Sequence, residues 1–161
     1  KELAERTDAR LFVIVATSHY SAERFTLTRM NFATPLGVAE TDQRYVDALV
    51  KHYGDGLFDD PFAHLPEHSV ELEVALLQHL FADRPVRIVP LLCGSFGDRV
   101  EGRADPAAAT DVARMVAALR AAEAECREPV CYVVSGDLAH IGPKFRDPEP
   151  VNEPLLAHSQ A

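Results

Sequence analysis

Four residues in this sequence could carry chemistry: His19, His68, Asp137 and His140. Imidazole and carboxylate groups bind divalent metals and transfer protons near neutral pH. Asp137 and His140 are three positions apart, so their side chains would share one face if this segment forms a helical turn. Contact with a carboxylate fixes the tautomer of an imidazole and raises its basicity, which suits a general base or a metal ligand. The same spacing also fits a structural contact that braces a loop.

These residues lie next to segments that are predicted to be strands. Three continuous apolar runs, rich in β-branched residues, are typical of strands buried on both faces of a sheet; they are residues 10–17, 86–93 and 130–134. His19 follows the first run, and Asp137 follows the third. Ligands of open α/β sheets bind beyond the carboxyl ends of the strands, so we expect these residues at one edge. Ser18 and Ser135 lie at the same strand ends and are predicted to contact a substrate.

Apolar residues at helical spacing predict three helices between these strands. Thr41 or Asp42 is expected to cap the first helix, and Gly54 to close it. The second helix should begin near residue 69 and end before 83–85, and the third should begin at residues 105–106 and reach about residue 125. Residues 34–37 indicate a turn, while 24–32 fit either a strand or an extended loop. We therefore predict a single α/β domain over residues 1–161, with three α/β/α layers, a largely parallel or mixed sheet, and a tail from 147.

Glu67, His68 and Ser69 stand at the start of the second predicted helix. His68 could reach the edge of the sheet that carries His19, and we expect Glu67 to contact a substrate there. Helix capping is the alternative, particularly for Ser69, because acidic and hydroxyl groups stabilise a helix N-terminus. His19 has a similar alternative as a surface residue after a strand. Cys93 is either a ligand or reactive thiol, or a small buried hydrophobic residue.

Composition excludes several classes of function. The net charge is −9 and the basic residues are scattered, so the chain lacks the basic stripe that nucleic-acid binding needs. The apolar runs are far shorter than the ~20 residues of a membrane-spanning helix, so we expect no membrane partner. Three cysteines without C-x-x-C spacing are typical of free thiols in a cytoplasmic protein.

Five segments, taken together and in order, resemble the Memo-like family. They are the strand and Ser-His pair at 14–19, the Thr-Pro-Leu-Gly turn at 34–37, the Glu-His-Ser-Val-Glu signature at 67–71, the Ile-Val-Pro strand at 88–94, and the segment from Ser-Gly-Asp to Phe at 135–145. The resemblance covers about residues 10–146. The family is related to the class III extradiol dioxygenases, and its bacterial members resemble the B component of the AmmeMemoRadiSam system.

The resemblance implies a fold, a cofactor and a reaction. The fold would be the α/β/α arrangement of the dioxygenases, which hold a non-haem iron and cleave catechol-type rings. His19 would be a metal ligand, and the cofactor a divalent metal, with iron(II) the favoured candidate. His68, Asp137 and His140 would be the catalytic residues that surround the pocket. The substrate would be an unidentified small molecule or peptide, and an oligomer is compatible with the resemblance.

The chain also departs from the family pattern. It lacks the earlier Pro-His-Ala-Gly-Tyr segment and the later Cys-Gly segment, each of which supplies a further ligand in the family. Tyr20 replaces a histidine, and Gly136 replaces a serine. Because useful metal sites need three or more protein ligands, we expect a fragment with an incomplete metal site. Three hypotheses follow: a metal-dependent oxidoreductase, a non-catalytic binding or regulatory protein that keeps the pocket, or a structural domain whose histidines have no such role.

Overall fold

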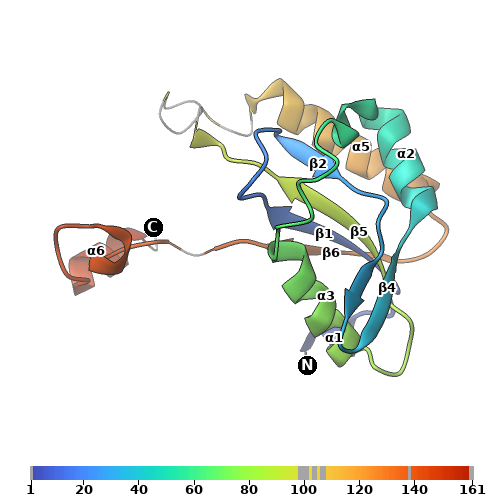
Figure 1. The fold of residues 1–161 in the computed structure, drawn as a ribbon, viewed down its shortest axis with the longest axis horizontal. Helices are drawn as coiled ribbons and strands as arrows, with labels where there is room; N and C mark the ends of the chain where they lie inside the picture. The colour runs from blue at the N-terminus through green and yellow to red at the C-terminus, as the bar shows by residue number, and fades with distance from the viewer. Residues whose placement is uncertain (1, 98–101, 103–104, 106–107, 138, 160–161) are drawn as a thin grey trace.

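The structure is a computed structural model that describes residues 2–97, 102, 105, 108–137 and 139–159 (Figure 1). Its centre is a mixed sheet in the order β3-β4-β5-β1-β6, in which β2 also pairs with β5. The strands are β1 Leu11–Thr17, β2 Phe25–Leu27, β3 Phe32–Thr34, β4 Gly37–Thr41, β5 Arg87–Cys93 and β6 Val130–Ser135. β1 runs parallel to both β5 and β6, while β2 is antiparallel to β5. The carboxyl ends of β1, β5 and β6 therefore meet at one edge.

Helices cover both faces of this sheet, which confirms the predicted three-layer α/β/α fold (Figure 1). On one face lie α2 (Gln43–Tyr53) and α5 (Thr110–Glu125), which pack on Leu11 and Val13 of β1. On the other face α3 (Ser69–Leu80) packs on Phe12 and Ile14 of the same strand, with α1 (Glu2–Arg6) beside it. Side chains alternate across a strand, so β1 supplies two hydrophobic cores from consecutive residues.

The ends of α2 follow from two residues that the sequence singles out. The carboxylate of Asp42 accepts a hydrogen bond from the backbone N of Tyr45 at 2.8 Å, which satisfies a free donor of the first turn. Gly54 follows the last turn with φ of 116°, a backbone state that favours glycine. Asp42, rather than Thr41, is thus the cap, and the predicted helix is confirmed.

The turn predicted at 34–37 is part of a hairpin. β3 and β4 pair antiparallel on either side of it, with Phe32 opposite Ala39. The segment 24–32, for which strand and loop were both open, contains the short strand β2. A 3-10 turn, η1 (Asp55–Phe58), follows α2.

Two predictions need correction. β6 was expected to be buried on both faces, yet Tyr132 and Val134 are 39% and 77% exposed. The reason is that β6 is the last strand of the described sheet, and one of its faces is left largely uncovered. The helix expected from residues 105–106 begins instead at Thr110, directly after the buried Ala109 at its N-cap; residue 106 lies outside the described residues.

The chain leaves the sheet after β6. Figure 1 shows the last segment extending away from the layers and ending in α6 (Glu153–Ser159), which follows the short turn η3 (Pro143–Phe145). α6 contains no buried residue. In the part of the chain that the structure describes, no helix has both the length and the apolar character needed to cross a membrane.

Candidate functional site

The end of β1 and the start of α3 are held together, and this brings His19 beside Glu67 and His68. The hydroxyl of Ser69 donates a hydrogen bond to the carbonyl of Thr17 at 2.7 Å. On the other side of β1, the backbone N of Ser18 donates to the carbonyl of Cys93, the last residue of β5, at 2.9 Å. Both contacts lie at the carboxyl edge of the sheet, where the sequence predicted the site.

Glu67 is the centre of this group, although its side chain is only 1% exposed. Its Oε1 accepts hydrogen bonds from the backbone N of His68 at 2.9 Å and of Ser69 at 3.1 Å. Its Oε2 accepts one from the backbone N of His19 at 2.8 Å. Burial alone would raise the pKa of this carboxyl, but the hydrogen bonds from His19, Ser69 and His68 outweigh it and lower the pKa to about 2. Glu67 is therefore ionised at neutral pH.

The ionised Glu67 fixes the orientation of His19. The Nδ1 atom of His19 lies 3.1 Å from both carboxylate oxygens. An ionised carboxylate only accepts hydrogen bonds, so Nδ1 must carry a proton, and in the neutral imidazole the lone pair is then on Nε2. Carboxylate–imidazole pairs of this kind hold metal-ligating histidines in proteins.

His68 stacks on His19. The two ring centroids lie 5.3 Å apart with an interplanar angle of 16°. The Nδ1 atom of His68 is 3.4 Å from Oε1 of Glu67, so the same carboxylate faces both rings. The side chains of His19 and His68 are 39% and 60% exposed, and both imidazoles are thus accessible from solvent.

This group is suited to part of a metal site. Within the described residues, His19, Glu67 and His68 place one ligand atom each within 4.8 Å of one another. Each oxygen of Glu67, however, already accepts at least two hydrogen bonds from nitrogen atoms. The carboxylate therefore fits the role of an orienting partner, and the donors left for a cation are the two imidazoles.

Asp137 and His140 form a second group. Nε2 of His140 lies 3.6 Å from Oδ2 of Asp137, and the ring packs edge-on against Phe145 at 4.5 Å. Both side chains are more than half exposed. Among the described residues, neither makes a hydrogen bond or ion pair to His19 or Glu67. The predicted pairing of Asp137 with His140 is present, and their catalytic role stays a prediction.

The residues predicted to contact a substrate lie along the same edge. Ser18 is buried, and its Oγ accepts a hydrogen bond from the backbone N of Ser21 at 3.3 Å. The carbonyl of Ser135 accepts one from the hydroxyl of Thr17 at 3.4 Å, which ties the end of β6 to the end of β1. Cys93 is half-buried, and burial raises the pKa of its thiol, which keeps it protonated and unreactive.

Sequence reasoning missed how the start of α3 is built. Ser69 was expected to cap the helix, but it is the first helical residue and His68 occupies the N-cap position without a side-chain bond. Glu67 supplies the acceptor for the first backbone donors instead. The signal was present in the Glu-His-Ser order, since a carboxylate just before a helix is favoured by the helix dipole.

Comparison with known proteins places the whole chain in one family. The model of the Memo-like protein family matches residues 1–159. A MEMO1 family protein of Methanobrevibacter smithii is 29% identical over 147 residues, which cover 90% of this chain and 47% of that protein. A MEMO1 family protein of Archaeoglobus fulgidus is 32% identical over 137 residues, 84% of this chain and 46% of its own length. One of Aquifex aeolicus is 29% identical over 137 residues, 84% of this chain and 33% of its own length.

This chain therefore spans about half the length, or less, of these curated relatives. No solved structure matches it significantly. The family match extends over nearly all of the chain, including the His19–Glu67–His68 group and the Asp137–His140 pair. The resemblance expected from the five sequence segments is confirmed, and the chain belongs to the Memo-like family.

Proposed function

We propose that His19 binds a divalent metal through Nε2, with His68 as its neighbour, and that the protein acts as a metal-dependent oxidoreductase related to the extradiol dioxygenases. The observation that carries this proposal is the contact of Glu67 with His19, because it leaves Nε2 as the lone-pair nitrogen. When bound, iron(II) would supply open coordination positions for oxygen and an aromatic diol. Water, substrate or a protein group outside this chain would fill the positions that the two imidazoles leave open.

The chain's own residues have separate tasks in this proposal. Glu67 orients His19 and, because its pKa is about 2, stays ionised throughout the neutral range. His68 is exposed beside His19 and can accept or donate a proton at its outward ring nitrogen. Asp137 would hold the ring of His140 in one orientation for the same purpose. The substrate is a small molecule or peptide that reaches the exposed side of the two stacked rings.

Metal binding can be tested without any substrate. Cobalt(II) is a spectroscopic probe for iron(II), and its visible absorption should appear on titration into the protein. His19→Ala should abolish this absorption, and Glu67→Gln should weaken binding by about 10- to 100-fold, as expected of a residue that orients a ligand. His79→Ala is the matched control, since His79 is an exposed histidine at the far end of α3.

The result that would contradict the metal proposal is an unsaturable titration of the unaltered protein, or equal affinity in His19→Ala and His79→Ala. Oxygen consumption with catechols, measured on the iron-loaded protein, then tests the reaction.

We also propose a cytoplasmic location, which the three free cysteines support because reducing compartments maintain free thiols.

One observation favours a second candidate, a binding or regulatory protein without catalysis. Both oxygens of Glu67 are occupied by hydrogen bonds, so only two imidazoles face a cation. Catalytic metal sites usually have three protein ligands. If cobalt(II) binds but the iron-loaded protein consumes no oxygen with catechols, and peptides or small molecules still bind in a His19-dependent manner, this second function is supported.

A further inference from the structure

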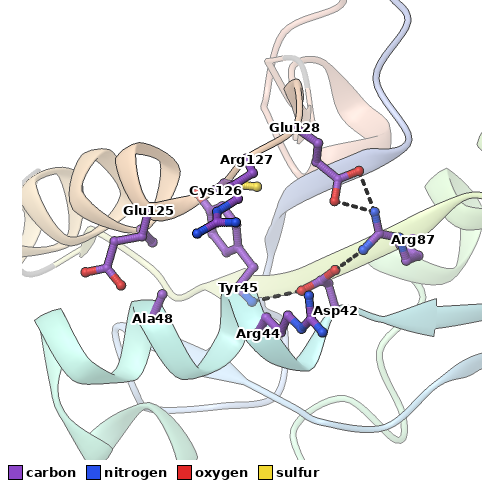
Figure 2. Close-up of a pocket in the computed structure, with 10 residues that line it drawn as sticks. Asp42, Arg44, Tyr45, Ala48, Arg87, Glu125, Cys126, Arg127 and Glu128 are labelled. Atoms are coloured by element: carbon purple, nitrogen blue, oxygen red, sulfur yellow. Dashed lines mark hydrogen bonds and ion pairs between the residues drawn. The ribbon is translucent and has the colours of Figure 1, made fainter.

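A pocket lies at the opposite edge of the sheet from His19. It has a volume of about 320 Å³ and is enclosed by the start of α2, the start of β5 and the segment that follows α5 (Figure 2). Arg87, at its wall, is the first residue of β5, whereas Cys93 at the other end contacts the His19 segment. Six steps along a strand separate the two edges by about 20 Å. The pocket is therefore distinct from the site proposed above.

The acidic residues of this pocket are all paired. Figure 2 shows Arg87 between Asp42 and Glu128, and its guanidinium forms an ion pair with each of them. Glu125, on the third side, lies 2.8 Å from Nζ of Lys51 and 2.7 Å from Nε2 of His52. Each of the three carboxylates that line the pocket therefore contacts a basic side chain, and Asp42 and Glu128 share Arg87.

Two arginines of the pocket have no such partner. Arg44, in the first turn of α2, and Arg127, just after α5, both line the pocket and are exposed. Within the described part of the chain, neither makes a hydrogen bond or an ion pair. The pocket is lined by three arginines and three carboxylates, and among the described residues Arg44 and Arg127 are the two of these arginines that no carboxylate engages.

The remaining wall is apolar. Ala48 and Ala122 line it together with the ring of Tyr45, whose hydroxyl is already bonded to Tyr132 at 2.9 Å. Small-molecule sites combine apolar walls with a few polar groups that fix orientation, and their volumes begin at about 300 Å³. Guanidinium groups recognise the paired oxygens of carboxylates and phosphates.

We propose that this pocket binds a small organic anion, a carboxylate or phosphate on a compact apolar body, which Arg44 and Arg127 hold from two sides. The apolar part of the ligand lies against Tyr45, Ala48 and Ala122. Arg87 is fixed by its two carboxylates and forms the rigid base of the pocket. The ligand therefore bridges α2 to the segment after α5.

The experiment is a titration with two probes, inorganic phosphate and benzoate, at constant ionic strength, followed by NMR of the arginine Nε–H signals. Saturable binding should shift the signals of Arg44 and Arg127. Each single change, Arg44→Gln or Arg127→Gln, should weaken binding by about three- to fivefold, and the double variant by about tenfold or more, as expected for exposed charge pairs. Arg120→Gln is the matched control, an exposed arginine of α5 outside the pocket.

The two probes distinguish the source of the anion. Binding of phosphate alone identifies a phosphorylated ligand, and binding of benzoate alone identifies a carboxylate; either result supports the proposal if the double variant weakens binding by about tenfold or more. His19→Ala should leave the affinity unchanged, so this test stands apart from the metal titration. Saturable binding of neither probe, or an equal loss of affinity in Arg120→Gln, overturns the proposal. Far-UV circular dichroism checks that every variant is folded.

Discussion

Replacing Glu67 with glutamine keeps the shape of the side chain but removes the charge that three backbone N–H groups and the ring of His19 share. The amide nitrogen of glutamine is a hydrogen-bond donor and would replace one of the two carboxylate oxygens. Each of these oxygens accepts from at least one backbone N–H group, so in either orientation of the amide two donors face each other. The variant therefore loses hydrogen bonds at a position that is almost fully buried, and we expect a large fall in the free energy of unfolding.

The magnitude follows from the pKa of Glu67, which is lowered from 4.5 to about 2 in the folded protein. Each pKa unit corresponds to about 1.4 kcal/mol, so the ionised carboxylate contributes about 3 kcal/mol to stability at neutral pH. Because the folded pKa lies below the unfolded one, this contribution is fully present above about pH 4.5 and is lost as the pH falls towards 2. Glu67→Gln has no group that titrates in this window.

The assay is urea denaturation at a series of pH values between 7 and 2.5 for the unaltered protein and for Glu67→Gln. The difference between their unfolding free energies should be about 3 kcal/mol at pH 7 and should shrink steadily below pH 4.5. Glu71→Gln is the control, since Glu71 is an exposed acid in the first turn of the same helix. The reasoning is refuted if both variants lose the same stability, or if the difference between Glu67→Gln and the unaltered protein does not depend on pH.

Three further predictions concern stability. Leu91→Ala should lower the free energy of unfolding by about 2–5 kcal/mol, because Leu91 is fully buried in the middle of β5 and leaves a cavity; urea denaturation checks this, and a loss below 1 kcal/mol would contradict it. Asp42→Ala removes both the cap of α2 and a partner of Arg87, so a loss of about 1–2 kcal/mol is expected, with reduced helical circular dichroism on heating. Burial lowers the pKa of His64 from 6.5 to about 4, against the opposing effect of the Thr26 carbonyl. The stability that depends on a neutral His64 is thus fully present above pH 6.5 and is lost as the pH falls towards 4. His64→Leu should therefore make the free energy of unfolding, measured by urea denaturation, less dependent on pH between 6.5 and 4. An unchanged pH dependence in this variant would contradict the prediction.

Strands with a long, continuous apolar pattern could be predicted from the sequence, whereas short strands with a weak apolar pattern could not. β1 and β5 were recognised because the interior of each strand is a continuous run of apolar residues, nearly all of them buried between the helix layers. β4 was missed because its two buried residues are Ala39 and Thr41, small side chains that give little alternation against the exposed Val38. The apolar run of β6 was recognised as a strand, but its composition does not reveal that one face is left uncovered.

The residues of the candidate site were found, but their roles depend on contacts that no spacing encodes. The sequence could place His19 and His68 near one edge of the sheet, since His19 follows β1 and His68 precedes α3. It could not show that Glu67 turns its carboxylate inwards to the backbone N of His19, because the two residues are 48 positions apart. Nor could it show that Arg87 is paired with two acids while Arg44 and Arg127 have no acidic partner among the described residues, since ion pairing depends on which long side chains reach one another.

The sparse burial of β6 also has a consequence for motion. Local opening of a folded protein is least costly where few apolar contacts must be broken, so amide hydrogen exchange should be faster in β6 than in its parallel neighbours β1 and β5. Asp137 and His140 follow directly from this strand, whereas His19 and Glu67 are anchored to the slow-exchanging part. Opening of β6 would therefore change the position of Asp137 and His140 relative to His19 and Glu67, and a contact that stabilises β6 would hold the two groups in a fixed relation.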